Sequence, residues 1–150
     1  MQASANFTKA IHICIYINLK GKLIPSSQLA ESLKTNPVVV RRLIALLRKH
    51  NIIGSVSGSQ GGFHLLRPAK EISLWNIFEA TKEEEFFHRP KVNHECVVSS
   101  NLSGLLFDAF QEAERSMKPK LKKVSIAFLT NKLKKIIGEK EVSEAIKGVF

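Results

Sequence analysis

The fold of this chain is decided by residues 34–70, which read KTNPVVVRRLIALLRKHNIIGSVSGSQGGFHLLRPAK. A helical pattern comes first, because Val40, Leu43, Ile44 and Leu47 fall on one face of a helix. A glycine-rich turn between two short apolar runs follows, which is typical of a β-hairpin. The stretch contains seven Lys or Arg residues and no Asp or Glu. A basic helix beside a basic hairpin suits a polyanion with grooves, such as DNA.

The composition of the whole chain favours the same partner. Its 150 residues suit one domain, or one domain with an appended helix. The net charge of +10 and the pI near 9.8 indicate nucleic acid or, as the weaker alternative, an anionic membrane surface. A basic protein without a polyanionic partner is the third interpretation. The acid-free stretch argues against it, because scattered surface charge usually mixes both signs.

The cysteines and the N-terminal segment indicate a compartment. Cys14 and Cys96 are too few and too far apart for a disulfide framework, which favours a reducing cytosol. The apolar run at 10–19 is too short to cross a bilayer, and the N-terminus lacks the pattern of a signal peptide. We therefore expect a cytoplasmic protein with no membrane partner. The sequence also has no phosphate-binding loop, nucleophile elbow or paired acids in a patterned site, so we expect no enzyme.

Two short helices are predicted to form a helix-turn-helix. The first runs over about 25–33, with a serine at its N-cap. The second opens at Asn36 as N-cap, followed by Pro37 at the first helical position, where no amide is needed. Asn51 follows its last turn, and asparagine tolerates the left-handed conformation there. A short connection between two helices, the second one basic outside, is a helix-turn-helix pattern.

The segment at 4–20 leaves two interpretations open. Alternating β-branched and aliphatic residues fit a strand: Ile11, Ile13, Ile15, Ile17 and Leu19. Four residues also trace one helical face: Ala10, Ile13, Cys14 and Ile17. Periodicity alone slightly favours the strand.

The remaining elements follow from local patterns. Strands are predicted at 52–57 and 63–66, around the glycine-rich turn. Ser73 is expected to cap a short helix. Residues 86–101, with their paired serines and a proline, are predicted to form a loop.

A long C-terminal helix is predicted at 102–117, and we expect Pro119 to end or kink it. Its apolar face consists of Leu102, Leu105, Leu106, Ala109, Phe110 and Ala113. We expect this face to pack on a partner, although it could instead cover its own domain. A last helix is predicted at 126–137, with Ile126, Leu129, Leu133 and Ile136 buried.

The stretches 35–49 and 53–66 resemble the Rrf2 family of bacterial winged-helix transcription regulators, and most of all its YwnA-like members. The wing residues that match are Ser55, Val56, Gly58, Gly61, Gly62, Phe63 and Leu65. The helix from about 102 matches the dimerisation helix of the family in position. The resemblance implies a homodimer on a palindromic operator, mostly as a repressor, and it makes the first segment a helix.

The fold class that we predict is therefore mainly α with a small β-hairpin. It consists of a winged helix-turn-helix plus a long C-terminal dimerisation helix. We expect a DNA-binding domain at 1–80, a loop and candidate sensor region at 81–101, and the dimerisation and C-terminal helices at 102–150.

The predicted contacts with double-stranded DNA lie on the second helix and the wing. They are Val38, Val39, Arg41, Arg42, Arg48, Lys49, Ser57, Ser59 and Gln60. Arginines bind phosphate or guanine, and an exposed valine contacts thymine methyls. The alternatives are a solvated helix face and, for Val39, a place in the core. Ser57 and Ser59 replace the usual Arg and Pro of the family, and residues 6–9 replace a more basic stretch.

The loop before the long helix is where cluster-bearing relatives place three cysteines, and this chain has only Cys96 there. One thiolate cannot hold an iron–sulfur cluster in the usual way, so we expect no cofactor. Zinc bound by Cys96, His88 and His94 is an incomplete alternative. A redox-reactive Cys96 near His94 and Lys91 is a further interpretation, and its alternative is an unreactive thiol with no role. The competing function is a winged helix that binds protein or RNA.

Overall fold

The computed structural model describes residues 2–82 and 91–148, with side chains from Ala5 onward. Six α-helices, one 3-10 turn and one two-stranded antiparallel sheet make up the described part, which confirms the predicted mainly α class with a small hairpin. In chain order the elements are α1 (Gln2–Lys20), α2 (Ser26–Ser32), α3 (Pro37–Lys49), β1 (Ile53–Val56), β2 (Gly62–Leu65), η1 (Ala69–Glu71), α4 (Leu74–Thr81), α5 (Val97–Lys122) and α6 (Ile126–Lys147).

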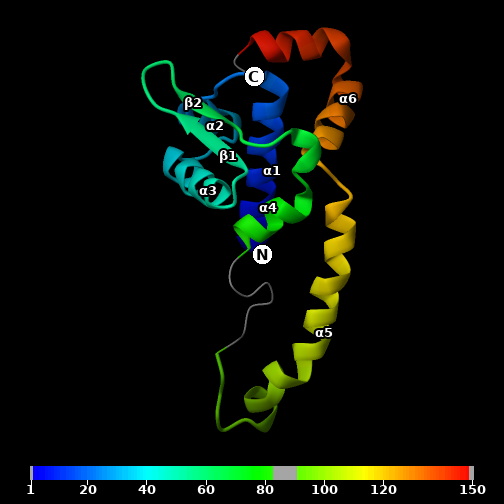
Figure 1. Cartoon of the computed structure of the whole chain (residues 1–150). Helices are drawn as coiled ribbons and strands as arrows, with labels where there is room; N and C mark the ends of the chain where they lie inside the picture. The colour runs from blue at the N-terminus through cyan, green and yellow to red at the C-terminus, as the bar shows by residue number, and fades with distance from the viewer. Residues whose placement is uncertain (1, 83–90, 149–150) are drawn as a thin grey trace.

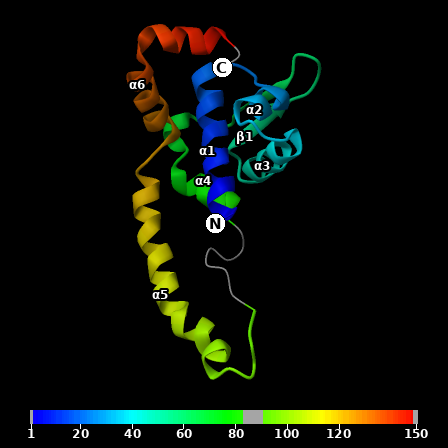
Figure 2. The same cartoon turned by 180° about the vertical axis from the view of Figure 1, so that it is seen from behind.

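Helix α1 is the centre of the molecule. Figures 1 and 2 show it between α2, α3 and the hairpin on one side and α6 on the other. Ile13 and Ile17 are buried, and Ile11 and Ile15 are half-buried against the same core. The strand that the alternating pattern at 11–19 favoured is therefore wrong, and the helix that the family resemblance implies is confirmed. A helix packed on several sides needs apolar residues around most of its circumference, and this hides the helical period.

The helix-turn-helix forms as predicted, with one correction. Asn36 caps α3, because its Oδ1 accepts a hydrogen bond of 2.8 Å from the amide of Val38. Asn51 follows α3 with a φ of 54°, the left-handed conformation expected there. The expected serine cap of α2 is wrong. Pro25 occupies the N-cap position, and the cap has no side-chain hydrogen bond.

The wing is pinned to the connection between α1 and α2. Strands β1 and β2 pair with Ile53 opposite Leu65. Ile24 extends the sheet, because it exchanges two backbone hydrogen bonds with Phe63, at 3.1 and 2.9 Å. A Cβ at Gly62 would lie 2.8 Å from the backbone of Ile24, so this close approach requires glycine. The predicted strand positions are confirmed to within one residue at all four ends.

Helix α4 begins at a reciprocal cap. The Ser73 hydroxyl accepts from the Asn76 amide, and the Asn76 side chain accepts from the Ser73 amide. The expected capping role of Ser73 is confirmed.

Helix α5 is longer than predicted at both ends. It begins at Val97, so the loop predicted up to residue 101 is wrong over its last five positions. Polar side chains there bond to carbonyls at the start of the helix: Ser100 Oγ donates to the carbonyl of Cys96 at 2.9 Å, and Asn101 Nδ2 donates to that of Val97 at 2.8 Å. Pro119 lies inside the helix, which continues to Lys122. A proline three residues before a helix end removes one hydrogen bond, while its φ still fits the helix.

The first part of helix α6 ends where it was predicted to end, because Gly138, with a φ of 78°, is non-helical. A second helical segment, which was not predicted, continues beyond this break to Lys147. Ile136 is 73% exposed, so its predicted burial is wrong, whereas Ile126 is fully buried. Beyond the break the helix turns across the C-terminal end of α1 (Figure 1). The buried Lys20 side chain holds it there by donating to the carbonyls of Ala145 and Gly148.

The core predicts the cost of a single truncation. Leu43→Ala removes a fully buried side chain of α3 and should lower the free energy of unfolding by about 2–5 kcal/mol. Arg41→Ala, at an exposed position on the same helix, should change it by no more than about 0.5 kcal/mol. Urea denaturation followed by circular dichroism measures both. Equal effects of the two substitutions would contradict the orientation of α3.

Candidate nucleic-acid interface

Helix α3 divides into a buried apolar face and an exposed basic face. Its buried residues are Val40, Leu43, Ile44 and Leu47. The predicted contact residues Arg41, Arg42, Arg48 and Lys49 are all exposed. Opposite placement of the two sets follows from the helical period, because apolar residues at this spacing occupy one side and leave the cations on the other.

The cations of α3 have no acidic partner within the described part of the chain. The ion pairs found there both belong to Lys82, which contacts Glu79 and Glu114. Arg42 has an uncharged hydrogen-bond partner, because its Nη2 donates to Oδ1 of Asn6 on α1 at 3.4 Å. The basic face is therefore free to attract phosphate, since no carboxylate neutralises it at contact distance.

Asn6 joins the site although its spacing in the sequence gave no signal for a role. It lies 36 positions before Arg42, so only the packing of α1 against α3 brings them together. The sequence singled out residues 6–9 only as a departure from the family. A side-chain carbonyl at this position limits the directions in which the Arg42 guanidinium can point.

The two valines at the start of α3 differ. Val38 is 61% exposed and is available for an apolar contact with a base. Val39 is half-buried and packs against the core, which supports the alternative that it is a core residue.

The wing carries the other predicted residues. Ser57, Ser59 and Gln60 are exposed at its tip. Figures 1 and 2 place the wing and α3 on the same side of α1, so one surface can present both. A Cβ at Gly61 would lie 2.2 Å from the carbonyl oxygen of Val56, so the turn itself depends on this glycine.

The two cysteines lie in opposite environments. Cys14 is fully buried in the core, and burial raises the pKa of its thiol to about 12. It is therefore a protonated core residue at neutral pH, as expected for a thiol on the apolar face of α1. Cys96 is exposed at the N-cap position of α5. Figure 1 shows that this end of α5 lies far from the wing, so the structure does not bring Cys96 to the basic surface.

Helix α5 presents the face that was predicted to pack on a partner. Leu105 is 71% exposed, and Ala109 and Ala113 are also exposed, whereas Leu102, Leu106 and Phe110 are half-buried. The helix has no fully buried residue among those described. Its N-terminal half extends away from the other helices (Figure 1).

The family follows from a comparison of the whole chain. Residues 3–132 match the model of the Rrf2 family, described as iron-dependent transcriptional regulators. This chain belongs to the Rrf2 family. YwnA of Bacillus subtilis (strain 168), provisionally described as an HTH-type transcriptional regulator, is 36% identical over 126 residues, which are 83% of this chain and 93% of that protein. The family and its members regulate transcription and are not enzymes.

Solved structures share the fold. A protein of Lactobacillus plantarum, provisionally described as a transcriptional regulator, superposes with a TM-score of 0.68 at 25% identity, covering 85% of this chain and 89% of that one. CymR of Staphylococcus aureus superposes with a TM-score of 0.57 at 22% identity, covering 84% and 95% of the two chains. The second likeness concerns the fold alone.

The thiols of this chain do not fit the iron chemistry in the family description. The sequence contains two cysteines in total, and Cys14 is locked in the core. Cys96 alone remains, and a cluster held by thiolates needs several of them. His88, part of the zinc alternative, lies outside the described residues.

No helix within 2–82 and 91–148 is long and apolar enough to cross a membrane.

Proposed function

We propose that this regulator binds a palindromic DNA operator sequence-specifically as a homodimer and acts as a repressor. The cationic face of α3, with no acidic partner among the described residues, carries the proposal. We assign DNA binding to residues 1–80 and dimerisation to residues 102–150. Residues 81–101 between them are a candidate sensor region. Repression is the mode of action that the family resemblance implies.

The proposed contacts use different chemistry on the helix and on the wing. Arg41 and Arg42 can reach phosphates or the acceptor edge of guanine in the major groove. Arg48 and Lys49, in the last turn of α3, suit phosphates on the groove wall. The wing tip offers hydroxyl and amide groups rather than a cation. We therefore assign most of the binding free energy to the helix.

The proposed dimer rests on the apolar face of α5. Three of its six apolar side chains are exposed and three are half-buried, on a helix whose N-terminal half extends away from the other helices. Apolar surface of this kind is unfavourable in water and favours a second copy of the same helix. A two-fold dimer presents two α3 helices to DNA, and successive major grooves on one side of the duplex lie about 34 Å apart.

Substitution of Arg41 and Arg42 tests the proposal that α3 binds DNA. Against a duplex selected from a random-sequence pool, we expect the Arg41→Ala/Arg42→Ala variant to bind at least about tenfold more weakly, because one bidentate base contact is worth about 1–3 kcal/mol. Each lost phosphate contact should lower the slope of log affinity against log salt by about one. Fluorescence anisotropy at several salt concentrations measures both.

The matched control removes two exposed cations from α6, in Lys132→Ala/Lys135→Ala. It should lose less affinity, because only general attraction changes. An equal loss in both variants would contradict the assignment of α3. Equal binding to RNA and to random duplex would favour the alternative, a winged helix without an operator.

A charge on the α5 face tests the dimer. Leu105→Asp should leave the chain as a 16.8 kDa monomer where wild type is dimeric. An uncompensated buried charge costs about 3–5 kcal/mol, which raises the dimer dissociation constant by at least about 100-fold. Sedimentation equilibrium measures it. Asn131→Asp, at an exposed position of α6, adds the same charge and should leave the dimer intact. A wild-type monomer at high concentration would exclude this interface.

A thiol response at Cys96 is the remaining part of the proposal. Its exposure at the N-cap position of α5 supports it, because an oxidant in solution can reach the sulfur there. Mild oxidation with hydrogen peroxide should change operator affinity of wild type several-fold and leave Cys96→Ser unchanged. The same anisotropy titration measures both proteins. Identical responses would remove Cys96 as a sensor.

A further inference from the structure

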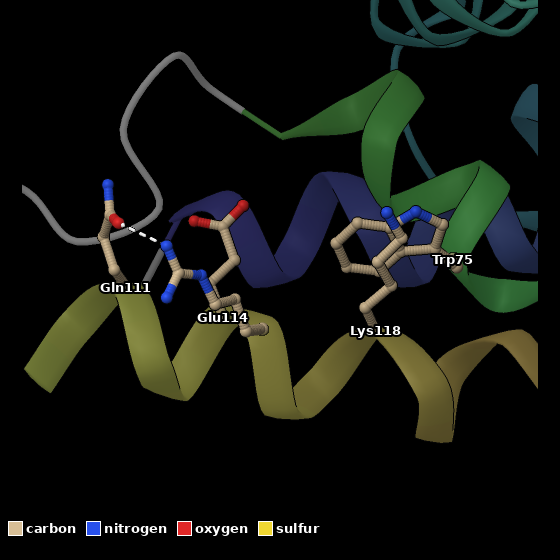
Figure 3. A pocket seen from close by; sticks show the side chains of 5 residues that line it. Trp75, Gln111, Glu114 and Lys118 are labelled. Carbon is tan, nitrogen blue, oxygen red and sulfur yellow. Dashed lines mark hydrogen bonds between the residues drawn. The ribbon is translucent and has the colours of Figure 1, made fainter. Parts of the chain in front are cut away.

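A groove separates α4 from the C-terminal half of α5. It is lined by Trp75 of α4 and by Gln111, Glu114, Arg115 and Lys118 of α5. Figure 3 shows the labelled side chains of α5 rising toward the side of the groove that holds Trp75. Its volume of about 340 Å³ lies near the lower end of the range for small-molecule sites, about 300–1,000 Å³.

The wall of the groove on α4 is a fixed aromatic ring. Trp75 is 9% exposed, and its ring packs on Phe78 with centroids 5.2 Å apart. Phe78 packs in turn on Phe7 of α1, edge to face at 5.7 Å. The Lys118 ammonium lies 5.5 Å from the centroid of Trp75. An indole packed from behind and covered only by the exposed Lys118 side chain is a surface on which a planar ligand can stack.

The charges of the groove leave two cations unneutralised. Its single carboxylate, Glu114, contacts Lys82 at 3.3 Å, and Lys82 also pairs with Glu79 at 2.9 Å. The hydrogen bond to Glu79, more than any other contact, raises the pKa of Lys82, so this lysine stays protonated. Arg115 and Lys118 have no acidic partner among the described residues. Arg115 instead donates to Gln111 Oε1 at 3.2 Å, which orients the guanidinium.

The groove lies on the side of α5 opposite its apolar face. At 100° per residue, the four groove residues of α5 centre about half a turn from the set that begins with Leu102 and Leu105. A second copy of the chain on the apolar face therefore leaves the groove open. The lining residues are thus better explained by a ligand than by the proposed dimer.

We propose that this groove binds a small aromatic carboxylate. The ring stacks on Trp75 in the place now taken by the Lys118 ammonium. The carboxylate accepts hydrogen bonds from Arg115, whose planar fork matches its two oxygens, and from Lys118. Because the ligand touches both α4 of the DNA-binding domain and the long helix α5, its binding favours the relative position of the two that buries it.

The single tryptophan of the chain reports on the site directly, because Trp75 is the only one in the sequence. Titration with sodium benzoate should change its fluorescence saturably. Benzyl alcohol, which has the ring without the charge, and acetate, which has the charge without the ring, should each bind at least about tenfold more weakly. Equal effects of the three probes, or no saturable effect of benzoate, would overturn the proposal.

Variants at exposed positions separate the site from the fold. Arg115→Gln and Lys118→Gln should each weaken benzoate binding by about tenfold, since each removes one charge-assisted contact. Lys120→Gln, on the opposite side of the same helix, should bind as wild type does. Calorimetric titration gives the affinities without relying on fluorescence, and urea denaturation confirms that each variant is folded. An equal loss in Lys120→Gln would overturn the assignment. The measurement contains no DNA, so its failure leaves the operator proposal untouched.

Discussion

The burial of one face of α3 is the constraint on which the exposed cationic surface of this helix depends. Leu43 and Leu47 are fully buried against α1 and its neighbours. Each such side chain contributes about 1.5–3 kcal/mol when it leaves water. Burying an unpaired arginine instead would cost far more, because its charge would lose its hydration. The apolar side of the helix thereby holds Arg41 and Arg42 outward, and the same burial that stabilises the fold orients the cations.

Helix α1 connects that surface to the rest of the molecule. Its buried residues form the centre of the core, and Asn6 near its first turns contacts Arg42 on α3. At its other end, Lys20 holds the last turns of α6 through their carbonyls. The other elements of the fold are thus arranged around α1. The thiols of this chain do not fit an iron–sulfur cluster. Cys14 contributes packing here, and Cys96 is left as a solitary exposed thiol.

Helix α5 has two functions in the proposed account because it has two faces. Its apolar face is available to a second copy, and its polar face lines a groove against Trp75 of α4. The same helix therefore takes part in the proposed dimer and in the proposed ligand site. A ligand that alters the angle between α4 and α5 would alter the distance between the two α3 helices of a dimer.

Local chemistry in the sequence determined the helix-turn-helix and the wing. Asn36 and Pro37 begin α3, Asn51 ends it, and the glycines permit the hairpin turn, because caps and turns depend on residues within a few positions. Tertiary structure decided what depends on distant neighbours. It made the alternating Ile11–Leu19 segment a helix surrounded by others, left Ile136 exposed, and began α5 inside the predicted loop.

The same division holds for the sites. The basic face of α3 could be predicted, because one helical period separates its cations from the core. The contact of Asn6 with Arg42 and the groove between Trp75 and Arg115 could not, since each joins residues more than 30 positions apart. Sequence periodicity records which side of a helix is apolar, whereas only the packing of helices determines which polar residues meet.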